Sequence, residues 1–187
     1  MKKFFIGVAL ITVLITVFLI FNHKQLPTDE DVIRITENWS RPTEEVYLVR
    51  KIDGEWLTIF RNNQSVMIAR LEQNWLGYWE MKDDLGNENT LVASDYPYLQ
   101  DEFNWTAGSK GRKISYYFGQ INNPSIKRIE VETKKDLLKD ALIISSKESR
   151  FFFVREEDEL VMPVNIRAFS ENGELIYSTI KPTKKVD

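Results

Sequence analysis

An uninterrupted apolar run near the N-terminus constrains this chain more than any other feature. Residues 4–21 read FFIGVALITVLITVFLIF, which is 18 residues without a charge. At about 1.5 Å per residue, a helix of that length measures roughly 27 Å, close to the ~30 Å hydrocarbon core of a bilayer. Because backbone amides inside a bilayer must pair within their own segment, the run predicts a membrane-spanning helix.

A cleaved signal peptide is the main alternative for this run. Its apolar region usually holds about 7–15 residues and ends at a small-residue cleavage site. Here the run is longer, and residues 22–27 read NHKQLP, with no Ala or Gly. A buried core helix fits less well, because the run has no polar face. We therefore expect an uncleaved anchor.

Basic residues around the run indicate its orientation. Lys2 and Lys3 precede it, whereas Lys24 and Arg34 follow it among acidic residues. The positive-inside tendency places the N-terminus in the cytoplasm and everything after the span outside the cell membrane. The chain then divides into a cytoplasmic tail (1–3), a transmembrane helix (4–21), a connector (22–45) and an extracytoplasmic β domain (46–187).

Composition excludes several kinds of chemistry. The 187 residues include no Cys and one His, so disulfides, Cys-ligated zinc, thiol chemistry and multi-His metal sites are excluded. His23 follows the apolar run closely, where an imidazole suits the headgroup layer better than catalysis. The formal net charge is −3, which disfavours binding to nucleic acid through phosphate neutralisation. We expect no cofactor and no nucleic-acid partner.

The connector carries a helix-start signal. Thr28 is suited to an N-cap position and is followed by three acids, so a short helix through about Asn38 is predicted. The alternating pairs Val32-Arg34 and Ile33-Ile35 keep a strand open as the rival interpretation.

From Val46 the apolar period changes to two. The segments 46–52, 55–61, 65–71 and 75–82 are rich in β-branched and aromatic residues and are separated by short turns such as Asp53-Gly54. This pattern predicts a four-stranded antiparallel meander.

Further strands are predicted at 114–120, 126–133, 141–145, 150–155, 160–169 and 174–180. Three consecutive rings at 151–153 indicate a central strand that is buried on both faces. Pro163 indicates that 160–169 is an edge strand, and 134–140 suits one or two helical turns. About ten short strands point to an all-β antiparallel sandwich or barrel, and the sequence does not separate these two architectures.

Three stretches carry a resemblance to a known group of proteins. The patterns KIDGEW…ARLEQNWLGYWEM, YYFGQINNPSIKRIEVE and NIRAFSENGELIY resemble small membrane-anchored envelope proteins of Gram-positive spore-forming bacteria. The resemblance covers most of residues 46–180. It implies an extracytoplasmic location and this fold, and it carries over no catalytic or binding residue.

Carboxylates and aromatics meet in the segment that follows Asp95. Asp101 and Glu102 lie near Tyr96 and Tyr98, and glycoside hydrolysis needs two carboxylates about 5–9.5 Å apart. Nothing in the spacing selects that geometry. A hydrolase acting on wall glycans through these two acids is therefore the alternative function.

Exposed aromatics could also stack on sugars or seat a partner's side chain. Trp75 and Trp79 are expected on one face of a strand, with Gly77 between them, although burial in the core is the competing interpretation. We expect at least one of the two to be buried. The candidate binding residues are Trp75, Trp79, Tyr96, Tyr98 and Trp105.

The polar loop 83–89 offers oxygen ligands at Asp83, Asp84 and Asn87. It lacks the spacing of an EF-hand, so a solvated turn is the simpler interpretation and no metal is expected. The leading hypothesis is a non-catalytic binding or interaction module at the cell envelope. Its partners would be the membrane through residues 4–21 and an envelope polymer or a protein.

Overall fold

The computed structural model describes residues 2–82, 90–96, 103–110, 114–135 and 137–180. Within them the chain forms two helices and thirteen strands, and the strands build three antiparallel sheets. The all-β prediction is confirmed, with thirteen strands in place of about ten. Of the two architectures left open, the structure has the sandwich, because none of the described sheets closes into a barrel.

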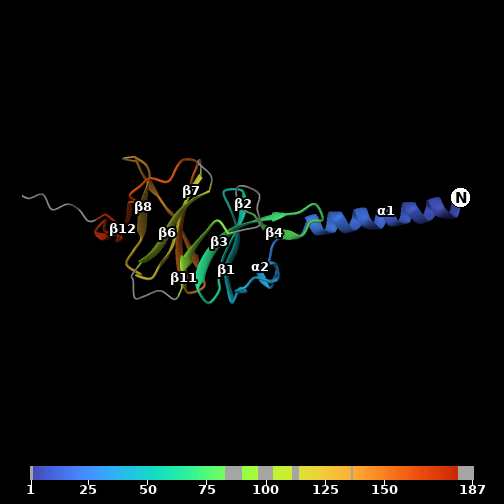
Figure 1. Cartoon of the computed structure of the whole chain (residues 1–187), viewed down its shortest axis with the longest axis horizontal. Coiled ribbons are helices and arrows are strands. Elements are labelled where there is room, and N and C mark those ends of the chain that lie inside the picture. The colour runs from blue at the N-terminus through green and yellow to red at the C-terminus, as the bar shows by residue number, and fades with distance from the viewer. Residues whose placement is uncertain (1, 83–89, 97–102, 111–113, 136, 181–187) are drawn as a thin grey trace, which may run out of the picture.

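Helix α1 (Lys2–His23) carries the apolar run and extends away from the β domain along the long axis of the molecule (Figure 1). From Phe4 onward it is long and apolar enough to cross a membrane, and none of that span is buried inside the protein. The Thr12 and Thr16 hydroxyls donate to carbonyl oxygens four residues earlier, at 3.0 and 2.9 Å. These two polar groups therefore need no water.

Helix α2 (Asp29–Thr36) begins with a capping box. The Thr28 hydroxyl accepts from the Asp31 backbone N–H at 3.3 Å, and the Asp31 carboxylate accepts from the Thr28 backbone N–H at 3.0 Å. The predicted helix is confirmed over the rival strand, although it ends at Thr36. Val32 and Thr36 are buried, so α2 is packed onto the domain within the predicted connector.

Sheet A is a meander followed by one added strand. Its strands are β1 (Glu45–Ile52), β2 (Glu55–Arg61), β3 (Ser65–Gln73), β4 (Trp79–Lys82) and β5 (Val92–Asp95). The first four pair in chain order, which confirms the predicted meander, and β5 pairs with β3 beyond the end of β4. Asp53 and Gly54 have φ values of 50° and 88°, as a tight hairpin turn between β1 and β2 requires.

One strand of the meander is shorter than predicted. Residues 75–77 belong to the turn between β3 and β4, and Gly77 has a φ of 82°. The prediction that Trp75 and Trp79 share one strand face is therefore wrong. The turn forms because the Asn74 side-chain oxygen accepts from the backbone N–H groups of Leu76 and Tyr78, at 3.0 and 3.1 Å.

Two more sheets complete the stack. Sheet B has the order β10-β11-β7-β6 and sheet C the order β13-β12-β8-β9. The strands of sheet B are β6 (Phe103–Lys110), β7 (Ile114–Ile121), β10 (Leu142–Ser146) and β11 (Ser149–Glu156). Those of sheet C are β8 (Arg128–Lys134), β9 (Leu137–Asp140), β12 (Ile166–Phe169) and β13 (Leu175–Ser178).

Sheet B is the middle layer. Phe151 and Phe153 pack against sheet A, whereas Phe152 packs against sheet C, so the prediction of a central strand buried on both faces is confirmed. The outer face of sheet A holds a third apolar cluster with Val32 of α2. Moving away from α1, the layers follow the order sheet A, sheet B, sheet C (Figure 1).

Two local predictions in the second half are wrong. Within 134–140 the chain forms strand β9, because its backbone pairs with β8. In the segment 160–169 the strand begins only at Ile166, and β12 lies between β13 and β8. Pro163 precedes the strand and so removes no ladder hydrogen bond, which is how a central strand tolerates a nearby proline.

Candidate functional site

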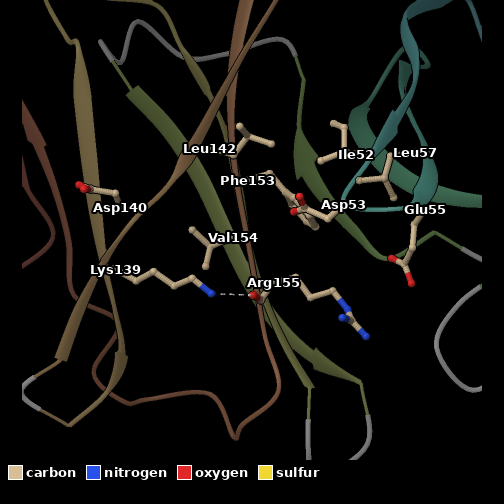
Figure 2. Close-up of a pocket in the computed structure, with 10 residues that line it drawn as sticks. All are labelled: Ile52, Asp53, Glu55, Leu57, Lys139, Asp140, Leu142, Phe153, Val154 and Arg155. Atoms are coloured by element: carbon tan, nitrogen blue, oxygen red, sulfur yellow. Dashed lines mark hydrogen bonds between the residues drawn. The ribbon is translucent and has the colours of Figure 1, made fainter.

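A cleft of about 310 Å³ opens where the three sheets come together at one side of the molecule (Figure 2). Each sheet contributes to its wall. Sheet A supplies the β1–β2 turn and the start of β2, sheet B supplies β10 and β11, and sheet C supplies the end of β9. The lining residues are Ile52, Asp53, Glu55, Leu57, Lys139, Asp140, Leu142, Phe153, Val154 and Arg155.

Chain connectivity creates this cleft. The Asp53-Gly54 turn sets the position of one wall. On the other side the chain passes from β9 in sheet C directly into β10 in sheet B, and the Ala141 backbone N–H donates to the Ile129 carbonyl at 2.8 Å at that crossing. Lys139 and Leu142 therefore lie on different sheets although they are three residues apart. Central strand β11 forms the base between the two walls.

The base of the cleft is apolar and firmly packed. Leu57, Phe153 and Val154 are buried. Leu142 on edge strand β10 is 43% exposed. Its side chain offers apolar contact area to a bound molecule.

Charged side chains line the rim of the cleft on both sides. Lys139 Nζ lies 2.8 Å from Glu156 Oε2. It also donates to the Arg155 carbonyl at 3.4 Å, which is the dashed contact in Figure 2. Arg155 Nη1 lies 3.5 Å from Glu157 Oε1.

Two carboxylates on the rim also have partners. Glu55 pairs with Arg70 at 3.6 Å, and Asp140 pairs with Arg128 at 3.6 Å. The Asp140–Arg128 pair is exposed and therefore weak, so a ligand group can replace one of its partners at little cost, whereas the Arg70 side chain is only 15% exposed.

The residues that line the cleft are charged or apolar, and no histidine is among them. Nucleophilic catalysis needs a nucleophile beside a base, and the only histidine, His23, lies at the end of α1, where its Nδ1 is 2.9 Å from the Leu19 carbonyl. In the part of the chain that the structure describes, no group of three or more His, Cys, Asp or Glu side chains is placed to hold a metal ion. The cleft combines an apolar base with side chains of both charges at its rim.

The structure separates the predicted binding aromatics. Trp75 is 77% exposed on the β3–β4 turn, whereas Trp79 is 9% exposed and packs edge-on to Trp56 at 6.1 Å. The expectation that at least one of the pair is buried is confirmed. Trp79 also lines a hollow of about 470 Å³ on the outer face of sheet A, beside Arg70 and Gln73.

The other aromatics lie elsewhere. Tyr96 lies under the Arg61 guanidinium, 4.7 Å from its ring centroid, and Trp105 donates to the Tyr177 hydroxyl at 3.1 Å between sheets B and C. These contacts give both residues a packing role. Several predicted residues lie outside the described residues, namely Tyr98, Asp101 and Glu102 of the binding and hydrolase predictions and Asp83, Asp84 and Asn87 of the metal prediction.

Two tyrosines near the sheet interfaces have shifted titrations. Burial raises the pKa of Tyr47, and the nearby Glu45 carboxylate adds to the rise. Burial also raises the pKa of Tyr117, whose hydroxyl donates to the Glu132 carbonyl at 3.3 Å. Each phenol therefore keeps its proton to a higher pH in the folded protein than an exposed tyrosine does.

Sequence reasoning missed the cleft. Its residues come from three separate stretches, 52–57, 139–142 and 153–155, and no local pattern indicates that these meet. The Asp53-Gly54 turn was the only signal, and it predicted a hairpin without indicating what faces it. The chain matches no protein-family model, no curated protein and no solved structure.

Proposed function

We propose that the protein is a single-pass membrane protein whose β domain acts as a non-catalytic binding module in the envelope of a Gram-positive cell. Helix α1 is the anchor, with its N-terminus in the cytoplasm. The domain outside binds a peptide-bearing component of the envelope in the cleft between the three sheets.

The anchor is supported by α1. The candidate span Phe4–His23 holds 20 residues and would measure about 30 Å at 1.5 Å per residue, which matches a bilayer core of ~30 Å. Left in water, such a surface would drive aggregation. Lys2 and Lys3 at one end, against acids beyond the other end, favour the proposed orientation.

The cleft is the observation that carries the binding role. An extended peptide presents apolar side chains together with carboxylates and amines, and the cleft offers a counterpart for each of these groups. Leu142 and Phe153 would contact the apolar groups, Lys139 and Arg155 the carboxylates, and Asp53 the amines. Stem peptides of the cell wall have this chemistry.

The test uses the full-length protein in lipid nanodiscs and purified, sonicated cell-wall peptidoglycan. We expect the protein to sediment with peptidoglycan and not with glycan from which an amidase has removed the peptides. Leu142→Glu should abolish sedimentation, because it places a charge against the apolar base. Leu175→Glu is the matched control, since Leu175 is 50% exposed on β13 of sheet C, outside the cleft. Equal binding by both variants, or no binding by the wild type, would contradict the proposal.

A further inference from the structure

The end of helix α1 is docked against the β3–β4 turn, which consists of residues 74–78. The Asn22 side-chain amide donates to the Leu76 carbonyl at 3.1 Å. In return, Gln73 Nε2 donates to the carbonyl oxygens of Asn22 at 3.1 Å and Gln25 at 3.3 Å. The turn therefore lies at the level where α1 would leave the membrane.

Gly77 makes this close approach possible. A Cβ atom at this position would lie 2.7 Å from the Cβ of Asn22 and 2.9 Å from the backbone nitrogen of His23. Its φ of 82° is also one that other residues rarely adopt. The Trp79 indole N–H adds a bond of 3.3 Å to the Gln25 carbonyl. Contacts on both sides of the turn thus hold it against the helix end.

Aromatic side chains project from this docked turn into the surroundings. Trp75 is 77% exposed and Tyr78 is 43% exposed, while Leu26, in the segment that leaves α1, is 66% exposed. No described residue accepts a hydrogen bond from the Trp75 indole N–H. Tryptophan and tyrosine are enriched where membranes meet water, because their rings are apolar and their polar atoms reach headgroup oxygens.

We propose that the β3–β4 turn is a second contact with the lipid surface, in which Trp75 and Tyr78 enter the headgroup layer of the leaflet from which α1 emerges. This inference rests on the membrane anchor of the proposed function and is independent of the cleft. The lipid surface is the occupant that the position favours, because the turn is bonded to residues 22 and 25 at the end of the span. Two contacts fix the tilt of the domain, whereas a single helix leaves it free to pivot.

The test measures tryptophan fluorescence of the full-length protein in nanodiscs. One set of nanodiscs contains lipids brominated near the headgroup and the other contains the same lipids without bromine. Flotation of the nanodiscs first establishes insertion. We expect brominated lipid to reduce the wild-type emission, and Trp75→Phe to remove most of that loss. Trp105→Phe is the control, because Trp105 lies between sheets B and C. In this variant, brominated lipid should reduce the emission by the same amount as in the wild type.

Each other outcome is informative. If the protein floats with nanodiscs but acrylamide in the water quenches Trp75 and brominated lipid does not, the turn lies in solvent and the inference fails while the anchor stands. If neither quencher reaches Trp75 in the inserted protein, a protein surface covers it and the inference also fails. If the protein does not float with the nanodiscs, the anchor fails and the inference with it.

Discussion

Trp75 and Trp79 are four residues apart, yet their surroundings are opposite. The turn at Gly77 reverses the chain between them, so Trp75 points away from the domain and Trp79 enters the cluster under α2. Trp75 is 77% exposed and Trp79 is 9% exposed. Substituting each of them therefore tests which of the two contributes to the stability of the fold.

We predict that Trp79→Ala lowers the free energy of unfolding by about 3–5 kcal/mol, because it leaves a cavity among packed side chains. Trp75→Ala should change it by less than ~0.5 kcal/mol, as exposed positions usually do. Urea unfolding of both variants in detergent micelles, followed by circular dichroism, measures the difference. Equal losses in the two variants would contradict the assignment of Trp79 to the core.

Because Tyr47 and Tyr117 are buried, the stability of the folded protein depends on pH in the alkaline range. Burial raises the pKa of each phenol in the folded protein, whereas the unfolded chain releases these protons near the ordinary value of about 10. The folded state then holds the protons more tightly, so this contribution to stability is complete below pH ~10 and is lost as the pH rises through the higher folded values.

We predict that the urea midpoint of the wild type falls as the pH rises above about 10, and that Tyr47→Phe makes the fall shallower, since it removes one titrating phenol. Tyr78→Phe is the control, because Tyr78 is exposed on the β3–β4 turn. The same pH slope in Tyr47→Phe and the wild type would show that the Tyr47 phenol does not contribute.

Among the elements of the fold, the β3–β4 turn connects the end of helix α1 to sheet A through hydrogen bonds. Its geometry depends on Gly77, where both a positive φ and the nearby Asn22 exclude a side chain. Gly173 has the same φ of 82°, but nothing lies within 4 Å of the position that its Cβ would take. Substituting each of the two glycines therefore distinguishes the effect of backbone strain from the effect of a steric clash.

We predict that Gly77→Ala loosens the docked helix end and that trypsin then cleaves after Lys24 faster than in the wild type. Gly173→Ala should leave that cleavage rate unchanged while costing similar backbone strain. Mass spectrometry of timed digests in nanodiscs measures both rates. Unchanged cleavage in Gly77→Ala would mean that the helix end is not held by the turn.

How far the sequence predicts these elements depends on how local their causes are. The capping box at Thr28 and the hairpin at Asp53-Gly54 were predictable, since neighbouring residues determine them. The β9 strand was not, because 137–140 becomes a strand only through pairing with β8. The cleft was missed for a related reason: residues about one hundred positions apart form it, and only the stacking of the sheets brings them together.

For the whole molecule, the layered order places α2 within the folded unit. Val32 is buried against sheet A together with Phe60 and Met67. Removing α2 would expose that face of the sheet, and burying a side chain such as valine contributes about 1.5–3 kcal/mol.

We predict that a fragment of residues 25–187 folds without α1 and without a metal ion, with a β-type circular dichroism spectrum that a chelator does not change. A fragment of residues 46–187 should unfold at lower urea concentration, because the outer face of sheet A loses its cover. Equal midpoints for the two fragments would show that α2 adds nothing to the stability of the domain.

The proposed function requires that the chain crosses the membrane once and that the β domain lies outside. Because the protein has no cysteine, single cysteines report the location of each part without background. The exposed Ser145 on β10 and Lys2 before the span are suitable positions for Ser145→Cys and Lys2→Cys.

The most direct test is labelling of these two variants with a membrane-impermeant maleimide in protoplasts of a Gram-positive host. We predict that Ser145→Cys is labelled in intact protoplasts and that Lys2→Cys is labelled only after lysis. Labelling of Lys2→Cys in intact protoplasts, with Ser145→Cys protected until lysis, would contradict the account.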